Sequence, residues 1–100
     1  IKALRDPDAR VRQGVAAVLG ETGNPGAVSH LRLLLGTDGA AGVRAEAAFR
    51  LGKIGDNGVL GELSMVAEAD PDMRVRGWAR WAVQQITLSH EFGSERQPSQ

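Results

Sequence analysis

The stretch Asp6-Pro7-Asp8-Ala9-Arg10-Val11-Arg12 decides the fold, because the chain contains it three times. The second copy is Asp38-Gly39-Ala40-Ala41-Gly42-Val43-Arg44 and the third is Asp70-Pro71-Asp72-Met73-Arg74-Val75-Arg76. The Val-Arg pair that closes each copy falls at 11/12, 43/44 and 75/76, which gives a period of 32 residues. A fixed period between about 20 and 50 residues is typical of stacked repeats, so we expect a chain built from repeated units.

Length and composition limit the classes of function. One hundred residues form at most one domain. Twelve Lys and Arg balance twelve Asp and Glu, so we expect no nucleic acid and no anionic membrane as partner, since both require excess basic charge. The absence of cysteine excludes disulfides and cysteine metal sites. No apolar run approaches the roughly 20 residues of a membrane span and no signal peptide is visible, so we expect a cytoplasmic protein.

Each copy opens a predicted helix. In the first, Asp6 is the expected N-cap, Pro7 takes the first helical position, and Gly20 and Gly23 end the helix. The Asn24-Pro25 pair starts a second helix that stops at Gly36, and Asp56 or Asn57 starts the equivalent helix one unit later. No segment alternates with a period of two, so we expect no strands.

The two ends of the chain differ from the repeats. Residues 1–4 are predicted to be the last turn of a preceding helix, and the final helix is predicted to run from Asp70-Pro71 to about Ile86. The expected repeat array therefore covers residues 1–86, as a partial unit plus two and a half helix pairs. Residues 87–100 show no periodicity and are predicted to be a polar, flexible tail.

The spacing, the caps and the small-residue pattern resemble a known family. An Asp-Pro-Asp-x-x-Val-Arg segment, followed by Ala-Ala and Leu-Gly and then a Gly-Asn or Gly-Asp turn, is similar to the short HEAT repeat of the type found in phycobilisome lyase subunits. The resemblance implies an all-α solenoid of helical hairpins wound into a right-handed superhelix. It also implies that the helices opened by the aspartate copies lie on the inner, concave side.

Aspartate and arginine recur six residues apart in every copy. One interpretation is a row of charges for a ligand. The interpretation that we favour is a ladder in which each arginine bonds an aspartate or turn carbonyl of a neighbouring unit, because a residue needed once per repeat is usually needed for stacking. The ladder residues are Asp6, Arg12, Asp38, Arg44, Asp70 and Arg76.

Positions that vary between the copies indicate a binding surface. Trp78 and Trp81 stand where the first unit has Gly14 and Ala17, so the fold does not require bulky side chains there. Tryptophan and arginine dominate the binding energy of interfaces. The alternative is that the tryptophans fold over the open end of the last unit, where Arg76, Arg80 and Gln84 form a polar stripe. The candidate partner-binding residues are Phe49, Trp78, Trp81, Arg10, Glu46 and Arg74.

These observations favour a non-catalytic module that binds another protein on the concave face, with self-association through an open repeat end as a further expectation. The alternative, by resemblance, is a subunit or fragment of a bilin lyase-like enzyme. Some HEAT-like hydroxylases hold a di-iron centre with His-Glu pairs placed just after Val-Arg. The matching positions here are Gln13-Gly14, Ala45-Glu46 and Gly77-Trp78, so we expect no metal, no cofactor and no catalytic residue.

Overall fold

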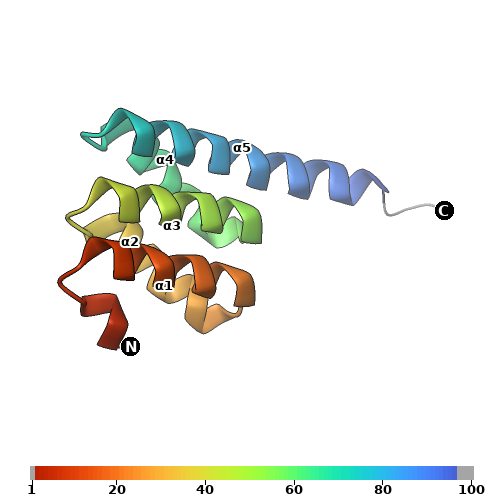
Figure 1. The fold of residues 1–100 in the computed structure, drawn as a ribbon. Helices are drawn as coiled ribbons and strands as arrows, with labels where there is room; N and C mark the ends of the chain where they lie inside the picture. Colours follow the sequence, from red (N-terminus) through yellow and green to blue (C-terminus); the bar gives the residue numbers. More distant parts are fainter. Residues whose placement is uncertain (1, 97–100) are drawn as a thin grey trace.

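The computed structural model describes the backbone of residues 2–96 and the side chains through Glu91. Within these residues every regular element is a helix, which confirms the predicted all-α fold (Figure 1). The α-helices are α1 (Ala9–Thr22), α2 (Pro25–Thr37), α3 (Ala41–Ile54), α4 (Leu60–Ala69) and α5 (Met73–Arg96), with short 3₁₀ helices η1 (Lys2–Arg5) and η2 (Asn57–Val59).

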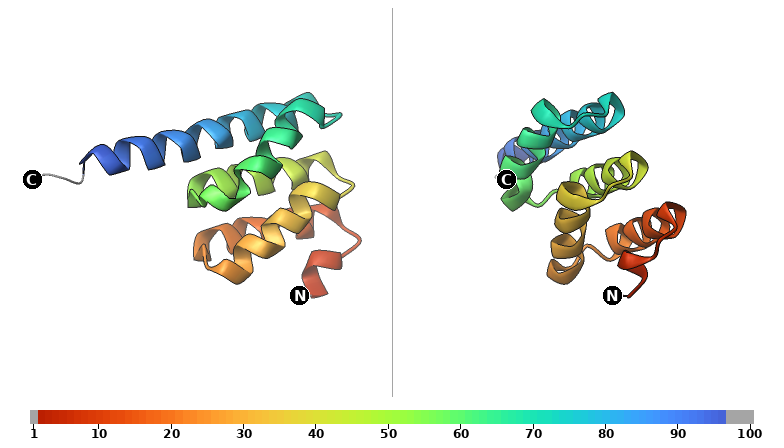
Figure 2. Two further views of the ribbon diagram at one scale, coloured as in Figure 1. Left: turned by 180° about the vertical axis from the view of Figure 1, so that it is seen from behind. Right: turned by 90° about the vertical axis from the view of Figure 1, so that its left-hand side faces the viewer.

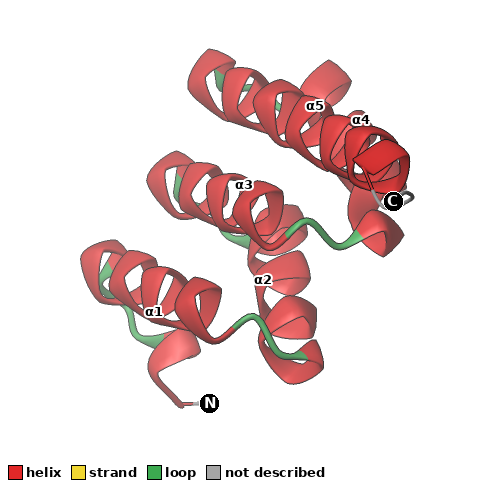
Figure 3. Cartoon of the chain, turned by 90° about the vertical axis from the view of Figure 1, so that its right-hand side faces the viewer, coloured by secondary structure: helices red, strands yellow, loops and turns green. Residues whose placement is uncertain are grey.

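The helices form two layers. The three helices opened by the aspartate copies, α1, α3 and α5, run side by side in the same direction, and α2 and α4 form the second layer behind them (Figures 2 and 3). Helix α3 packs against α1, α2 and α5. The molecule is elongated, with extents of 51 × 27 × 16 Å, and its long dimension follows α5, which extends beyond the other helices (Figure 1). The predicted α-solenoid is therefore confirmed.

The core lies between the two layers. Leu31 and Leu35 of α2 pack there with Leu51 of α3, Leu63 of α4 and Ile86 of α5, and all five are almost completely buried. Burial of each such side chain contributes about 1.5–3 kcal/mol. Alanines, valines and Leu34 fill the remaining buried apolar positions, and the alanines let the helices approach closely.

Helix α1 does not begin where the sequence predicts. The Asp6 carboxylate accepts a hydrogen bond from the Asp8 N–H at 2.8 Å and closes a turn that contains Pro7. Asp8 then becomes the N-cap, because its own carboxylate accepts from the Arg10 N–H at 2.9 Å. In the third copy Asp70 and Asp72 repeat these two hydrogen bonds. The prediction of Asp6 as N-cap is thus wrong by two residues, whereas Asn24 caps α2 with Pro25 at its first position, as expected.

Two glycines predicted to end helices, Gly20 and Gly36, lie inside α1 and α2. Gly23 does end α1, with φ +63°, but Gly20 is a helical residue within Ala9–Thr22. A Cβ on Gly20 would lie 2.8 Å from Cβ of Arg50, and a Cβ on Gly52 would lie 2.8 Å from Cβ of Ala82. Gly20 and Gly52 therefore allow the next helix of the layer to approach, and that is why they recur at the repeat period.

The ends of the array also differ from the prediction. Helix α5 does not stop at Ile86 but continues to Arg96, so residues 87–96 are helical (Figure 1). Nε2 of His90 lies 3.0 Å from the Gly55 carbonyl oxygen, which ties this extension to the end of α3. At the other end, residues 2–5 form a 3₁₀ turn in place of an α-helical one. Residues 97–100 of the predicted tail lie outside the described residues.

Candidate functional site

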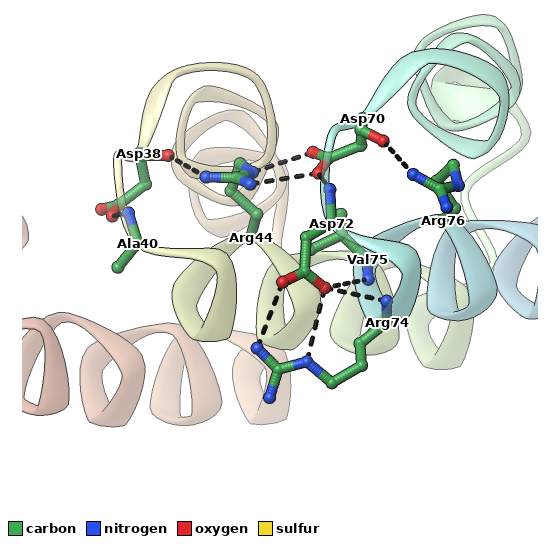
Figure 4. A network of polar contacts seen from close by, with 8 residues as sticks. All are labelled: Asp38, Ala40, Arg44, Asp70, Asp72, Arg74, Val75 and Arg76. Atoms are coloured by element: carbon green, nitrogen blue, oxygen red, sulfur yellow. Dashed lines mark hydrogen bonds and ion pairs between the residues drawn. The ribbon is translucent and has the colours of Figure 1, made fainter.

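The arginines of the first two copies each clamp two neighbouring units together. Nε and Nη2 of Arg44 donate to the two carboxylate oxygens of Asp70 at 2.8 and 3.0 Å, and Nη1 donates to the Asp38 carbonyl at 2.9 Å (Figure 4). Arg12 makes the same two bonds to Asp38, at 2.8 and 3.0 Å. The Arg44 and Asp70 side chains are only 13% and 6% exposed. This is the connectivity that the ladder hypothesis requires.

The clamps keep their aspartates ionised. Burial by itself would raise the pKa of the Asp38 carboxyl, but hydrogen bonds from the Arg12 side chain and the Ala40 N–H outweigh it and lower that pKa. Burial and hydrogen bonding oppose each other in the same way at Asp70, where Arg44 is the donor, and the pKa is again lowered. The bond to Asp70 in turn raises the pKa of Arg44.

The third copy ends differently. Nη1 of Arg76 donates to the Asp70 carbonyl at 2.7 Å, as Nη1 of Arg44 does to the Asp38 carbonyl. Nη2 of Arg80 donates to the Ala67 carbonyl at 3.2 Å. That carbonyl would normally accept from the residue four positions on, which is Pro71 and has no N–H. Arg80 therefore satisfies a carbonyl that the proline leaves without its helical partner.

Three aromatic side chains meet between α3 and α5. The ring centres of Phe49 and Trp78 are 5.2 Å apart at 74°, and those of Phe49 and Trp81 are 5.4 Å apart at 23°. Trp78 and Trp81 are 5.5 Å apart, edge to face. Such pairs contribute about 0.5–1.5 kcal/mol beyond the area that they bury. The cluster therefore joins the two helices and leaves Trp78 42% exposed.

The alternative in which both tryptophans cap the open end of the last unit is wrong. Cζ3 of Trp81 would lie 2.8 Å from a Cβ on Gly52, so the indole sits on α3, on the side of α5 that faces the preceding unit. Gly20 and Gly52 face the next helix of the layer. Gln84 occupies the same repeat position in α5, so the open side of the last unit is the side that carries Gln84. Trp81 is consequently part of the α3–α5 contact.

A pocket of about 400 Å³ opens beside the aromatic cluster, and we call it the central pocket. Its floor comes from residues 42, 45, 46 and 49 of α3, whose spacing places them on one helical face. Gly42 and Ala45 create the space because their side chains are small. Gln13 of α1 bounds it on one side and α5 on the other. The lining residues are Gln13, Gly42, Ala45, Glu46, Phe49, Arg50, Arg74 and Trp78.

A charged pair crosses the pocket floor. Nε of Arg50 donates to Oε2 of Glu46 at 2.7 Å, and Nε2 of Gln13 donates to Oε1 of Glu46 at 3.4 Å. The Arg50 guanidinium carbon lies 5.1 Å from the centre of the Phe49 ring. The aliphatic stem of Arg50 covers Gly20, while its guanidinium reaches the surface of the pocket.

Comparison with known proteins now identifies the fold. A family model described as HEAT repeats matches residues 1–84. The chain belongs to the HEAT-repeat family. Among solved structures, human deoxyhypusine hydroxylase in complex with glycerol is similar, with a TM-score of 0.83 and 29% sequence identity over 98% of this chain and 33% of that chain. The HEAT-repeat chain thus spans about one third of the length of that protein. No curated protein matches it.

The family match confirms the HEAT resemblance but does not distinguish the narrower lyase-type class. Within the HEAT-repeat chain, the central pocket gathers four of the six predicted partner-binding residues, namely Glu46, Phe49, Arg74 and Trp78. Trp81 packs against Phe49 and Trp78 but does not line the pocket, and Arg10, with its side chain 91% exposed, lies outside it. The sequence prediction did not select Gln13, Gly42, Ala45 and Arg50. Alignment of the repeats could have identified Gln13, Gly42 and Ala45. Gly42 aligns with Arg74, and Gln13 and Ala45 occupy the same repeat position in successive units.

Neither a metal cluster nor a membrane-spanning helix occurs among the described residues. In that part of the HEAT-repeat chain no three His, Cys, Asp or Glu side chains come together as metal ligands would. The described helices include none with the length and apolar character of a membrane span.

Proposed function

We propose that this HEAT-repeat chain is a non-catalytic interaction module that binds another protein across the α1–α3–α5 layer, with the central pocket at the middle of the contact. The observation that carries the proposal is Trp78. Its indole remains 42% exposed at the edge of a pocket, although Phe49 and Trp81 hold it in place. Large exposed aromatic residues fixed beside a pocket are typical of interface hot spots.

The fold itself does not demand a side chain at this position. The first unit has Gly14 there, and a Cβ on Gly14 would have no neighbour within 4 Å. Trp78 therefore occupies a place where the stacking of units leaves open space. Stacked repeats present elongated surfaces of this kind to their partners.

A second surface supports the proposal that copies of the chain self-associate. Val43 and Val75 are completely buried, but Val11 at the same repeat position is 41% exposed on α1. Val18 on the same helix is 62% exposed. These valines form an apolar surface on the outer side of the first described unit.

An enzymatic role is the second candidate, because the similar solved structure is by its name a hydroxylase. The sequence positions after each Val-Arg pair hold Gln13-Gly14, Ala45-Glu46 and Gly77-Trp78, which do not repeat a His-Glu pair. We therefore place a non-catalytic role first. A bilin lyase-like subunit would instead retain a tetrapyrrole, which visible absorbance detects.

The test is an affinity column that carries the chain, followed by mass spectrometry of the retained proteins. Trp78→Ala removes the exposed indole, and Leu88→Ala is the control, because Leu88 is 46% exposed on the α5 extension away from the pocket. We expect proteins that the parent chain and Leu88→Ala retain and that Trp78→Ala loses. An identical set on all three columns, or a tetrapyrrole in place of protein, would contradict the proposal.

A further inference from the structure

We infer that the central pocket receives an acidic side chain of the partner, an aspartate or glutamate that is flanked by an apolar residue. The inference rests on the proposed function, since it names the chemistry of the protein segment that the same site binds. The inference follows from a comparison of the carboxylates and the arginines at the pocket, since the carboxylates already accept hydrogen bonds and the arginines retain donors.

Glu46, which lines the pocket, and Asp72, which pairs with the lining residue Arg74, are already hydrogen-bonded. Both oxygens of Glu46 accept hydrogen bonds, from Arg50 and Gln13. Asp72, at the start of α5, accepts from the Arg74 N–H and from Nε and Nη2 of the Arg74 side chain (Figure 4). An incoming cation would have to share Glu46 with Arg50, whose guanidinium is already 2.7 Å from it and would repel a second positive charge. The pocket is therefore poorly suited to a lysine or arginine of the partner.

The arginines retain donors. Within the described part of the chain, Arg50 donates through Nε, and no described residue accepts from its Nη1 or Nη2. Among the described contacts, the Arg74 side chain likewise donates through Nε and Nη2 alone, and it is 72% exposed. A guanidinium presents five N–H groups in a planar fork that matches a carboxylate. The donors that Arg50 and Arg74 leave unused at the pocket are therefore cationic and suit a carboxylate.

The aromatic walls of the pocket favour an apolar residue next to the acidic side chain of the partner. Phe49 and Trp78 meet at the pocket with ring centres 5.2 Å apart, so an apolar side chain next to the acid would pack on them. Arg74 lines the pocket beside these rings. Arg10 occupies the same repeat position in the first unit, but it does not line the pocket. Both arginines pair with their own N-cap aspartate at 3.1–3.2 Å. Arg10 is thus a matched control for Arg74.

The experiment titrates the 100-residue chain with three acetylated and amidated pentapeptides in which leucine alternates with glutamate, glutamine or lysine. Tryptophan fluorescence is the readout, since Trp78 borders the pocket. We expect the glutamate peptide to bind at least tenfold more tightly than the glutamine peptide and the lysine peptide to bind most weakly. Arg74→Gln should reduce glutamate binding to the glutamine level, while Arg10→Gln should leave it unchanged and Arg74→Lys should retain part of the preference.

Three results would overturn the inference: equal binding of all peptides, tightest binding of the lysine peptide, or no binding of any peptide. Equal binding that Trp78→Ala abolishes would remove the acidic preference and leave the proposed function standing. The same is true if no peptide binds but the affinity column still retains proteins that depend on Trp78. If neither experiment shows dependence on Trp78, both proposals fail.

Discussion

Each clamp arginine joins three segments of chain through one planar group. Arg44 spans from the turn before α3 to the turn before α5, so it fixes the distance between successive units. Its bonds are charge-assisted and bidentate, and its surroundings exclude most solvent. By contrast, Arg10 pairs only with the adjacent Asp8 in full contact with water, where an ion pair contributes little.

Arg44→Ala should therefore lower the free energy of unfolding by about 1.5–3 kcal/mol, because it removes charged hydrogen bonds from a largely buried pair. Arg10→Ala should leave the urea midpoint close to that of the parent chain. Chemical denaturation followed by circular dichroism measures both variants. Equal midpoints for the two would refute the ladder as a stabilising device.

The six-residue spacing was enough to predict that these arginines bond across units. The spacing could not specify the hydrogen-bond acceptor, because it is compatible with both an aspartate carboxylate of the next unit and a backbone carbonyl of a turn. The structure shows that Arg44 uses both at once. The two edges of a guanidinium allow this, and sequence spacing alone contains no information about which edge faces which segment.

At the scale of the helices, glycine controls how closely neighbours in a layer approach. Gly52 of α3 has Ala82 and Trp81 directly over it, and the nearest backbone atom, Cα of Ala82, would be 2.9 Å from an added Cβ. Gly14 of α1 is also inside a helix, but a Cβ there would meet nothing within 4 Å. The two positions therefore separate the effect of packing from that of helix propensity.

Gly52→Ala should destabilise the chain by about 1–3 kcal/mol, because α5 must shift to make room for the methyl group. Gly14→Ala should instead stabilise it by up to about 1 kcal/mol, since alanine is the better helix former and the space is open. Thermal denaturation of the two variants in parallel measures this difference. Stabilisation by both substitutions would show that α3 and α5 do not pack as closely as described.

The helix boundaries show what periodicity can and cannot predict. Asn24-Pro25 marked the start of α2 correctly, because the amide caps the helix and proline fits its first turn. Asp6-Pro7 looked the same but failed, since a second aspartate follows and takes the cap. The α5 extension was missed because residues 87–91 are all exposed. A helix with no buried face has no hydrophobic pattern to read.

At the scale of the molecule, the repeat period predicted the architecture because stacking depends only on contacts between neighbouring units. The central pocket was predicted only in part. Its aromatic residues stood out against the repeat, but its small residues did not, because Gly42 and Ala45 are unremarkable in a chain with 13 glycines. A cavity forms where side chains are small, and single sequence positions do not reveal it until the arrangement of the helices is known.

Acid should loosen the whole stack, since a carboxylate clamp crosses both contacts of the α1–α3–α5 layer. Burial opposes ionisation of Asp38 and Asp70, but their hydrogen bonds outweigh it, so each folded pKa lies below the ordinary value of about 3.9. A carboxyl with a lowered pKa adds stability that is complete above the unfolded pKa and is lost as the pH falls through the folded one. We therefore expect the free energy of unfolding to fall between about pH 4 and pH 2.

In Asp38→Asn/Asp70→Asn this pH dependence should be smaller, with lower stability at pH 7. Glu62→Gln is the control, because Glu62 pairs with Arg32 at the surface, where their side chains are 43% and 42% exposed. Urea midpoints at pH 7, 4 and 2 make the measurement, and an unchanged slope in the double asparagine variant would mean that the acid transition begins elsewhere.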